Sequence, residues 1–554
     1  THVVKGRGKA VVVGTGMDTE VGGIAEQIST AEDEQTPFQK EVDRLGTRIA
    51  VLVLGIVGLT AAVQAALTGA DLLTIVLLGI GLSVAGVPES LPPIVTLTLS
   101  IGSKRLLKED ALVRSLPVVE ALGSVDHIVT DKTGTLTEGV MTVKKVYTPG
   151  NEYEVTGTGM DTDGEFRSGD QVVDPEGDID KILECGRICN NAEVVETEDG
   201  EMEYRGEPTE TALLVSSAKA GIEKEYSRQT TVPFSSSRKR MTVVSDDTAY
   251  MKGAPGTVLE RCDRVLMDGE VKDLDEEMRQ EIRDRNHEYA NDALRVLGFA
   301  RKKDVDADAG SEELESEMVF LGLQGMIDPP REEVREAVHD CRTAGIKVVM
   351  ATGDNVETAK AVGEQLGFST ENAVTGQEIE EMTDSELQDA VNDAEIFARV
   401  NPEHKVKISE ALKDQGFNVA MTGDGVNDAP ALKHADVGIA MGERGTDVAK
   451  KSSDMVLQDD NFVTIRDAIS EGRHIFDTIR KTTSQILSTN SGEVMFVFLG
   501  TLIAGLLFPG EFSGSDAVIL TAAQILWVKF ASDGPPAIAL TKDPKVEGIM
   551  ERPP

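Results

Sequence analysis

Residues 127–137 read His-Ile-Val-Thr-Asp-Lys-Thr-Gly-Thr-Leu-Thr, so a short apolar run ends directly at Asp131. A short apolar run followed by polar residues and Gly predicts a buried strand. A carboxylate at the tip of such a strand faces backbone N–H groups and is well placed to attack a phosphoryl group. Taken alone, the pattern also fits a strand-to-helix turn with a capping Asp.

Two further apolar runs, residues 346–352 and 417–422, also end in polar loops. Helix-like patterns over residues 331–343 and 403–413 connect such strands. This alternation favours a parallel, doubly wound α/β sheet, with active residues at the carboxyl ends of its strands.

The loops after these strands supply the groups that phosphoryl transfer requires: a nucleophile, a hydroxyl and a lysine for phosphate oxygens, and acids for Mg²⁺. The candidate catalytic residues are Asp131, Lys132, Thr133, Thr352, Gly353, Asp354, Lys405, Asn427 and Asp428, with Asp424 as a further acid. Phosphoryl transfer depends mostly on positioning and on charge neutralisation, so the combination predicts a phosphorylation site.

Four apolar runs, residues 49–70, 72–100, 486–508 and 518–540, are each long enough to cross a bilayer core of roughly 30 Å. They predict two transmembrane hairpins. Neither turn contains Lys or Arg, whereas the opposite flanks do, which places the turns outside and the rest in the cytoplasm. We therefore expect an integral, multi-pass protein of the cell membrane, with the lipid bilayer as a partner.

The 554 residues include 55 Lys and Arg against 96 Asp and Glu, a net charge of −41, which excludes nucleic-acid binding through a basic surface. The acidic excess indicates adaptation to high salt, with an ordinary acidic surface as the alternative. Four cysteines without a CxxC motif disfavour both a disulfide framework and a heavy-metal relay.

The segment from Met141 to about Phe320 interrupts the α/β alternation and is predicted to be an inserted domain. Within it, residues 161–180 and 304–317 are predicted to be acidic surface loops.

The motifs after the strands resemble those of the P-type cation-transporting ATPases of type II, the calcium and sodium pumps, over essentially the whole chain. The resemblance implies a haloacid dehalogenase-like, Rossmann-type phosphorylation domain in which ATP phosphorylates Asp131. It implies Mg²⁺ held by Asp131, Asp424 and the carbonyl of Thr133, with Asn427 and Asp428 in support. Related phosphatases carry an acid where this chain has Thr133, so a long-lived phosphoenzyme is expected.

The resemblance also identifies the inserted segment as an α+β nucleotide-binding domain for ATP. Its candidate binding residues are Glu210, Phe234, Lys239, Lys252 and Arg295. Phe234 would stack on adenine, Lys252 would close the pocket beside it, and Arg295 would neutralise phosphate charge. Taken alone, Phe234 also fits an ordinary core position.

Ser236 stands where calcium pumps of the family usually carry an Arg. The resemblance then implies that Arg238 or Lys239 substitutes for the missing guanidinium.

A cation site is predicted within the second apolar run, which reads Val84-Ala-Gly-Val-Pro-Glu-Ser-Leu-Pro92. Pro88 and Pro92 each remove a helix N–H and free upstream carbonyls beside an intramembrane acid. The family reads PEGLP where this chain reads PESLP, and its heavy-metal members carry Cys there. The resemblance implies as ligands of the transported cation Val84, Ala85, Val87, Glu89, Asn490, Glu493, Lys529, Ser532 and Asp533.

Lys529 is the sharpest departure from the family pattern, because calcium pumps have Asn and sodium pumps have Asp at this position. Lys529 and Asp533 are four residues apart, so one interpretation is a self-neutralising pair. The other is that the ammonium replaces one transported ion.

The resemblance gives the expected domain order. Residues 1–30 would be an actuator-domain remnant, 45–108 and 471–545 the two hairpins (the family's third to sixth spans), 109–140 with 321–470 the phosphorylation domain, and 141–320 the nucleotide-binding domain. By the same comparison the chain is a fragment, and the remaining parts of the pump are expected partners.

These features together predict ATP-driven cation transport with Mg²⁺ and ATP, most consistently of Ca²⁺, with Na⁺ as the alternative ion. Two other functions stay open, a soluble-type phosphatase with incidental apolar helices and a non-pumping remnant that binds nucleotide or a partner.

Overall fold

The computed structural model describes residues 37–67, 71–88, 90–196, 202–224, 226–508, 510–512 and 518–553. The expected actuator segment and Glu89 lie outside these residues, as do parts of both hairpin turns. Two compact units divide the chain. The first holds residues 1–129, 339–348 and 402–554, and the second holds residues 130–338 and 349–401.

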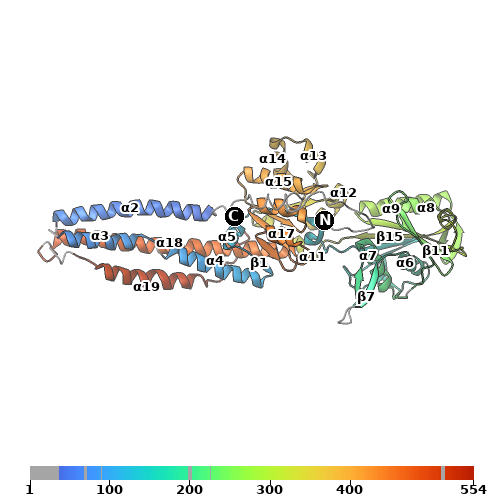
Figure 1. The fold of residues 1–554 in the computed structure, drawn as a ribbon, viewed down its shortest axis with the longest axis horizontal. Helices are drawn as coiled ribbons and strands as arrows, with labels where there is room; N and C mark the ends of the chain where they lie inside the picture. Colours follow the sequence, from blue (N-terminus) through green and yellow to red (C-terminus); the bar gives the residue numbers. More distant parts are fainter. Residues whose placement is uncertain are drawn as a thin grey trace, which may run out of the picture. The chain divides into compact units, whose positions relative to one another are not determined.

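The first unit contains a bundle of long helices (Figure 1). They are α2 (Pro37–Leu67), α3 (Leu72–Gly86), α4 (Leu91–Lys108), α18 (Phe462–Leu507) and α19 (Ala522–Leu540). In the described part of the chain, three helical stretches are long and apolar enough to cross a membrane: 47–66, 72–108 and 462–507. The fourth apolar run forms α19, which is not among these stretches and carries Gln524, Lys529 and Asp533.

The core of this bundle is aliphatic. Leu78, Leu82 and Ala85 of α3 pack against Val494 and Val497 of α18, together with Ile525 of α19. Between α3 and α4 the chain leaves the helical conformation at Val87 and Pro88, as expected for a proline without an N–H.

The first unit also contains a sheet with the strand order β1-β21-β20-β19-β2. The strands are β1 (Ala111–Val113), β21 (Met455–Leu457), β20 (Val437–Met441), β19 (Val419–Gly423) and β2 (His127–Thr130), whose last residue opens the second unit. All pairs are parallel except β1 with β21. The associated helices are α5 (Leu116–Gly123), α15 (Pro402–Asp414), α16 (Ala429–His434) and α17 (Asp447–Ser452).

The strands β16 (Lys347–Thr352), β18 (Ile396–Ala398) and β17 (Val374–Thr375) form a parallel run, which belongs to the second unit from Val349 onward. The helices of this region are α11 (Glu332–Thr343), α12 (Val356–Leu366), α13 (Gly376–Glu381) and α14 (Asp384–Asp393). The strands predicted at 127–131, 346–352 and 417–422 and the helices predicted at 331–343 and 403–413 are confirmed to within two residues. Buried parallel strands read as continuous apolar runs, which is why the sequence revealed them.

The rest of the second unit is built on an eleven-stranded, mostly antiparallel sheet, with the order β6-β5-β4-β3-β15-β14-β11-β10-β9 and with β12 and β13 beside β15. Its strands are β3 (Thr142–Thr148), β4 (Asn151–Val155), β5 (Phe166–Ser168), β6 (Gln171–Val173), β9 (Thr230–Val232), β10 (Arg240–Ser245), β11 (Thr248–Gly253), β12 (Cys262–Met267), β13 (Glu270–Asp273), β14 (Arg295–Lys303) and β15 (Met318–Ile327).

Helices α6 (Asp178–Ile188) and α7 (Pro208–Lys219) share one hydrophobic core with this sheet. The remaining elements are α8 (Pro255–Leu259), α9 (Glu276–Asn291), α10 (Ser311–Leu314) and the hairpin of β7 (Glu193–Glu196) and β8 (Met202–Arg205). The prediction of surface loops over 161–180 and 304–317 was wrong in part, because the first contains β5 and β6 and the second contains α10.

Candidate functional site

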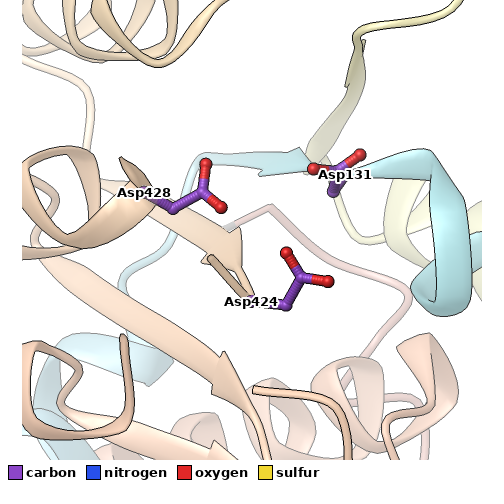
Figure 2. Close-up of side chains that lie close together, drawn as sticks. All are labelled: Asp131, Asp424 and Asp428. Carbon is purple, nitrogen blue, oxygen red and sulfur yellow. The ribbon is translucent and has the colours of Figure 1, made fainter. Parts of the chain in front are cut away.

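Three carboxylates meet at the carboxyl ends of two parallel strands. In the pairing of β2 with β19, Val129 lies opposite Met421, and each strand ends within two residues of that pair. Asp131 and Asp424 are the first residues after their strands. One carboxylate oxygen from each of Asp131, Asp424 and Asp428 lies within 4.8 Å of the others (Figure 2). Such an all-oxygen acidic set suits Mg²⁺.

The turn after β2 fixes the Asp131 side chain. Asp131 accepts a hydrogen bond of 2.8 Å from the Lys132 N–H and caps the short turn Lys132–Leu136. Gly134 in this turn has φ 78°, which a residue with a Cβ rarely adopts. Thr133 is exposed beside Asp131.

Lys132 is buried and points to acids of its own unit. Its ammonium lies 2.8 Å from Asp354, which follows β16, and 3.8 Å from Asp328. Thr352 is also buried at the end of β16, and its hydroxyl accepts the Asp354 N–H at 3.2 Å, while Gly353 between them is exposed. The predicted Thr-Gly-Asp loop is thus anchored at both ends.

Lys405 and Asp428 form a buried ion pair of 2.9 Å in the first unit. The second oxygen of Asp428 accepts the Gly425 N–H at 3.0 Å, and the Asp424 carbonyl accepts the Thr446 N–H at 2.8 Å. These bonds hold the loop after β19 in one conformation, with Asn427 exposed. A lysine beside three acids can offset charge as anionic oxygens enter.

Two of the predicted nucleotide-binding residues contact each other. Lys252 on β11 lies 2.7 Å from Glu210 on α7, and both side chains are largely buried. Glu210 also accepts bonds from Asn191. Phe234, before β10, is 49% exposed, so the alternative of an ordinary core position is wrong.

Of the two proposed substitutes for the missing guanidinium, Arg238 is already engaged. It pairs with the buried Glu315 at 2.8 Å and donates to the Pro233 carbonyl at 2.6 Å. Lys239 is exposed with φ 52°, and Arg295 is exposed at the first residue of β14. Lys239 is therefore the better-placed substitute.

The predicted cation ligands of the first unit fall into two groups. In the first group, the carbonyls of Val84, Ala85 and Val87 all accept hydrogen bonds from the Lys529 ammonium, at 2.7 Å for Val84 and 3.3 Å for Ala85. Glu89 lies outside the described residues.

The second group consists of side chains on α18 and α19. Ser532 donates to Glu493 at 3.1 Å, and Ser90 donates to Asp533 at 3.2 Å. Among the described residues, both amide atoms of Asn490, one oxygen of Glu493 and one oxygen of Asp533 have no hydrogen-bond partner. No ion pair within 4.0 Å joins Lys529 and Asp533 in the described chain, although the Lys529 charge still interacts electrostatically with Asp533 and Glu493.

Residues 178–333 match the family model described as "P-type ATPase, cytoplasmic domain N", and residues 517–554 match "Cation transporting ATPase, C-terminus". Two segments of the chain thus match family models of P-type ATPases.

Curated proteins match the chain over its full length. It is 42% identical to the calcium-transporting ATPase of Bacillus subtilis, over 100% of this chain and 62% of the relative. It is 39% identical to the cation-transporting ATPase pma1 of Synechocystis, again over 62% of the relative. It is 37% identical to the human calcium-transporting ATPase type 2C member 1, over 59% of that protein. The chain thus spans about three fifths of the length of these relatives.

The sequence analysis did not identify Asp328 as a residue of the candidate site. This buried acid accepts bonds of 2.6 Å from the Thr137 hydroxyl and the Gly139 N–H, besides lying near Lys132. It directly follows β15 and precedes Pro329 and Pro330. The sequence did contain a signal for this residue, because an acid directly follows a long apolar run and precedes two prolines.

Proposed function

We propose that this chain forms the ATP-using and ion-binding part of a cation pump that works through an aspartyl phosphate on Asp131, with Ca²⁺ as the transported ion. The observation that carries the proposal is the meeting of Asp131, Asp424 and Asp428 at the strand ends. The printed names of the Bacillus subtilis and human relatives, calcium-transporting ATPases, favour Ca²⁺ over Na⁺.

In the proposed reaction, a carboxylate oxygen of Asp131 forms a bond to the γ-phosphorus of ATP. The bond from that phosphorus to the β–γ bridging oxygen breaks, and ADP leaves with the electron pair. Asp131, Asp424 and the Thr133 carbonyl would hold Mg²⁺, which supplies charge neutralisation on the phosphoryl oxygens.

Lys405 and the Thr352 hydroxyl would contact the transferred phosphoryl oxygens. Asp428 keeps the Lys405 ammonium in position through their 2.9 Å ion pair. Thr133 carries no ionisable side chain to activate water, which supports a persistent phosphoenzyme rather than a phosphatase.

The nucleotide would bind over the antiparallel sheet of the second unit. The exposed ring of Phe234 would stack on adenine, and Lys239 and Arg295 would meet phosphate charge. Lys252, already paired with Glu210, would line the pocket rather than carry a phosphate.

We assign the parallel strands around Asp131 to a haloacid dehalogenase-like phosphorylation domain. We assign the helices α2, α3, α4, α18 and α19 to two transmembrane hairpins. The catalytic units would then lie on the cytoplasmic side. The parallel strands, the apolar helices and the family matches support these assignments.

The test uses the full-length protein that contains this chain, in sealed vesicles. We expect ATP-dependent uptake of ⁴⁵Ca²⁺ that Asp131→Asn abolishes, because asparagine cannot form the acyl phosphate. Uptake that continues at the parent rate in Asp131→Asn would rule out the mechanism. ATP-driven uptake of ²²Na⁺ in place of ⁴⁵Ca²⁺ would rule out the proposed ion alone.

A further inference from the structure

The ammonium of Lys529 occupies a cage of backbone carbonyls. Lys529 lies on α19 and is 8% exposed. It donates to the carbonyls of Val84, Ala85 and Val87, where α3 ends. An ammonium has three N–H donors, so it can donate to several carbonyls at once.

These carbonyls are available because of the proline that follows them. In a continuous helix the Val84 carbonyl would accept the N–H of residue 88, but Pro88 has none. The N–H of Leu91, the natural partner of the Val87 carbonyl, donates instead to Pro88 at 3.2 Å. Carbonyls without a donor in an apolar environment are costly and bind a cation readily.

A second set of oxygens lies on α18 and α19 and remains open. Asn490 and Asp533 are 3% and 1% exposed. Among the described residues, the Asn490 oxygen, one Glu493 oxygen and one Asp533 oxygen have no hydrogen-bond partner. Buried oxygens of this kind require a partner, and carboxylate and amide oxygens are the ligands that a Ca²⁺ ion takes.

The two sets therefore differ in occupancy. The carbonyls at the end of α3 are contacted by the Lys529 ammonium, a cation that belongs to the chain. The set on α18 and α19 has no such cation within it among the described residues and combines the carboxylates of Glu493 and Asp533 with neutral oxygens. A divalent ion placed among the carbonyls of Val84, Ala85 and Val87 would have to displace the ammonium or lie against its positive charge.

We propose that Lys529 is a tethered cation that permanently fills one of two cation positions, so that the protein binds a single divalent ion at Asn490, Glu493, Ser532 and Asp533. This rests on the proposed function for the identity of the ion, and it specifies the stoichiometry of the same site.

The experiment measures equilibrium ⁴⁵Ca²⁺ binding to the purified full-length protein without ATP, expressed per mole of protein. We expect one high-affinity ion per parent chain and a Hill coefficient near one. We expect Lys529→Asn to bind a second ion or to change the affinity at least about tenfold, because it opens the carbonyls and removes a neighbouring positive charge. Lys529→Arg should keep one ion.

Lys542→Asn is the matched control, since Lys542 is exposed just beyond the same helix and contacts none of these carbonyls in the described structure. It should bind as the parent does. Two ions per parent chain, or Lys529→Asn with unchanged stoichiometry and affinity, would overturn the proposal. If Lys529→Asn does not fold, the parent count decides between one ion and two.

Binding is measured without ATP, so its outcome is separate from that of the proposed function. A parent that binds one ion but forms no phosphoenzyme would contradict the pump and leave the tethered cation supported. A parent that forms the phosphoenzyme but binds two ions would support the pump and overturn the tethered cation.

Discussion

Lys132 shows how this chain stabilises a buried charge next to its candidate nucleophile. Lys132 is 4% exposed, and Asp354 and Asp328 lie 2.8 and 3.8 Å from its ammonium. A buried ammonium needs such partners because its desolvation is costly. The same contacts join the turn after Asp131 to the Thr-Gly-Asp loop, so positioning and charge compensation come from one side chain.

His127 lies on β2, four residues before Asp131, and gives a pH-dependent stability. Its ring is buried against Phe417, with ring centres 4.5 Å apart. Burial, reinforced by the positive Lys347 and opposed by Asp126, lowers the pKa of His127 from 6.5 to about 4.

We predict that the free energy of unfolding falls as the pH drops from about 6.5 to about 4. In that window the unfolded chain gains a proton on this histidine and the folded chain does not, so the folded state loses about 2 to 3 kcal/mol. His127→Gln should remove this part of the pH dependence, measured by urea unfolding at pH 6.5 and 4.5.

The matched control is His287→Gln, since His287 is exposed on α9. It should keep the parent slope between the two pH values. A His127→Gln protein with the same slope as the parent would show that another group titrates.

At the scale of elements, the helix α18 connects the region of the parallel sheet with the helix bundle. It runs unbroken from Phe462 to Leu507. Its first half packs on α5 beside the parallel sheet, and its second half carries Asn490 and Glu493. Because a continuous helix resists bending, we expect a displacement near the sheet to move Asn490 and Glu493 with it.

The contact of α18 with α5 depends on two glycines. A Cβ on Gly472 would lie 2.8 Å from the backbone nitrogen of Gly123 and 2.8 Å from the Leu122 side chain. We predict that Gly472→Ala forces the helices apart and costs about 1 to 3 kcal/mol, seen as a lower thermal unfolding temperature in detergent.

Gly492→Ala is the control on the same helix, because nothing lies within 4 Å of its added methyl group. It should stay within about 1 kcal/mol of the parent. Equal unfolding temperatures for the two variants would mean that the close approach of α5 and α18 is not needed for stability.

The sequence predicted the elements that have a strong apolar pattern. The strand ending at Asp131 and the break of the helix at Pro88 both followed from local rules. The hairpin of β5 and β6 was missed because its three-residue strands are stabilised by pairing with β4, which a local pattern does not contain. The sequence analysis also missed the polar first half of α18, because the burial of that half depends on tertiary packing and not on a local apolar pattern.

The candidate site was predictable residue by residue but not in its contacts. The acids after β2 and β19 followed from the rule that active groups gather at strand ends. The contacts of Lys529 with the carbonyls at the end of α3 could not be predicted in this way. Asp533 is near Lys529 in the sequence, whereas those carbonyls are more than 400 residues away.

At the scale of the whole molecule, the same chain offers three sets of residues with different chemistry. The carboxylates after β2 and β19 suit a phosphoryl group with Mg²⁺, the sheet with Phe234 suits a nucleotide, and the polar atoms between α3, α18 and α19 suit a cation. A pump that uses ATP needs all three, whereas a phosphatase or a simple nucleotide-binding domain does not need the last.

The most direct test of this account is the chemistry of the phosphorylated residue. Full-length protein incubated with γ-³²P-ATP and Mg²⁺ and quenched in acid should carry a label that hydroxylamine removes, since an acyl phosphate has that lability. Asp131→Asn should carry none, and Asp163→Asn, in an exposed loop of the second unit, should label as the parent does. A label that persists in Asp131→Asn, or that resists hydroxylamine, would contradict the account.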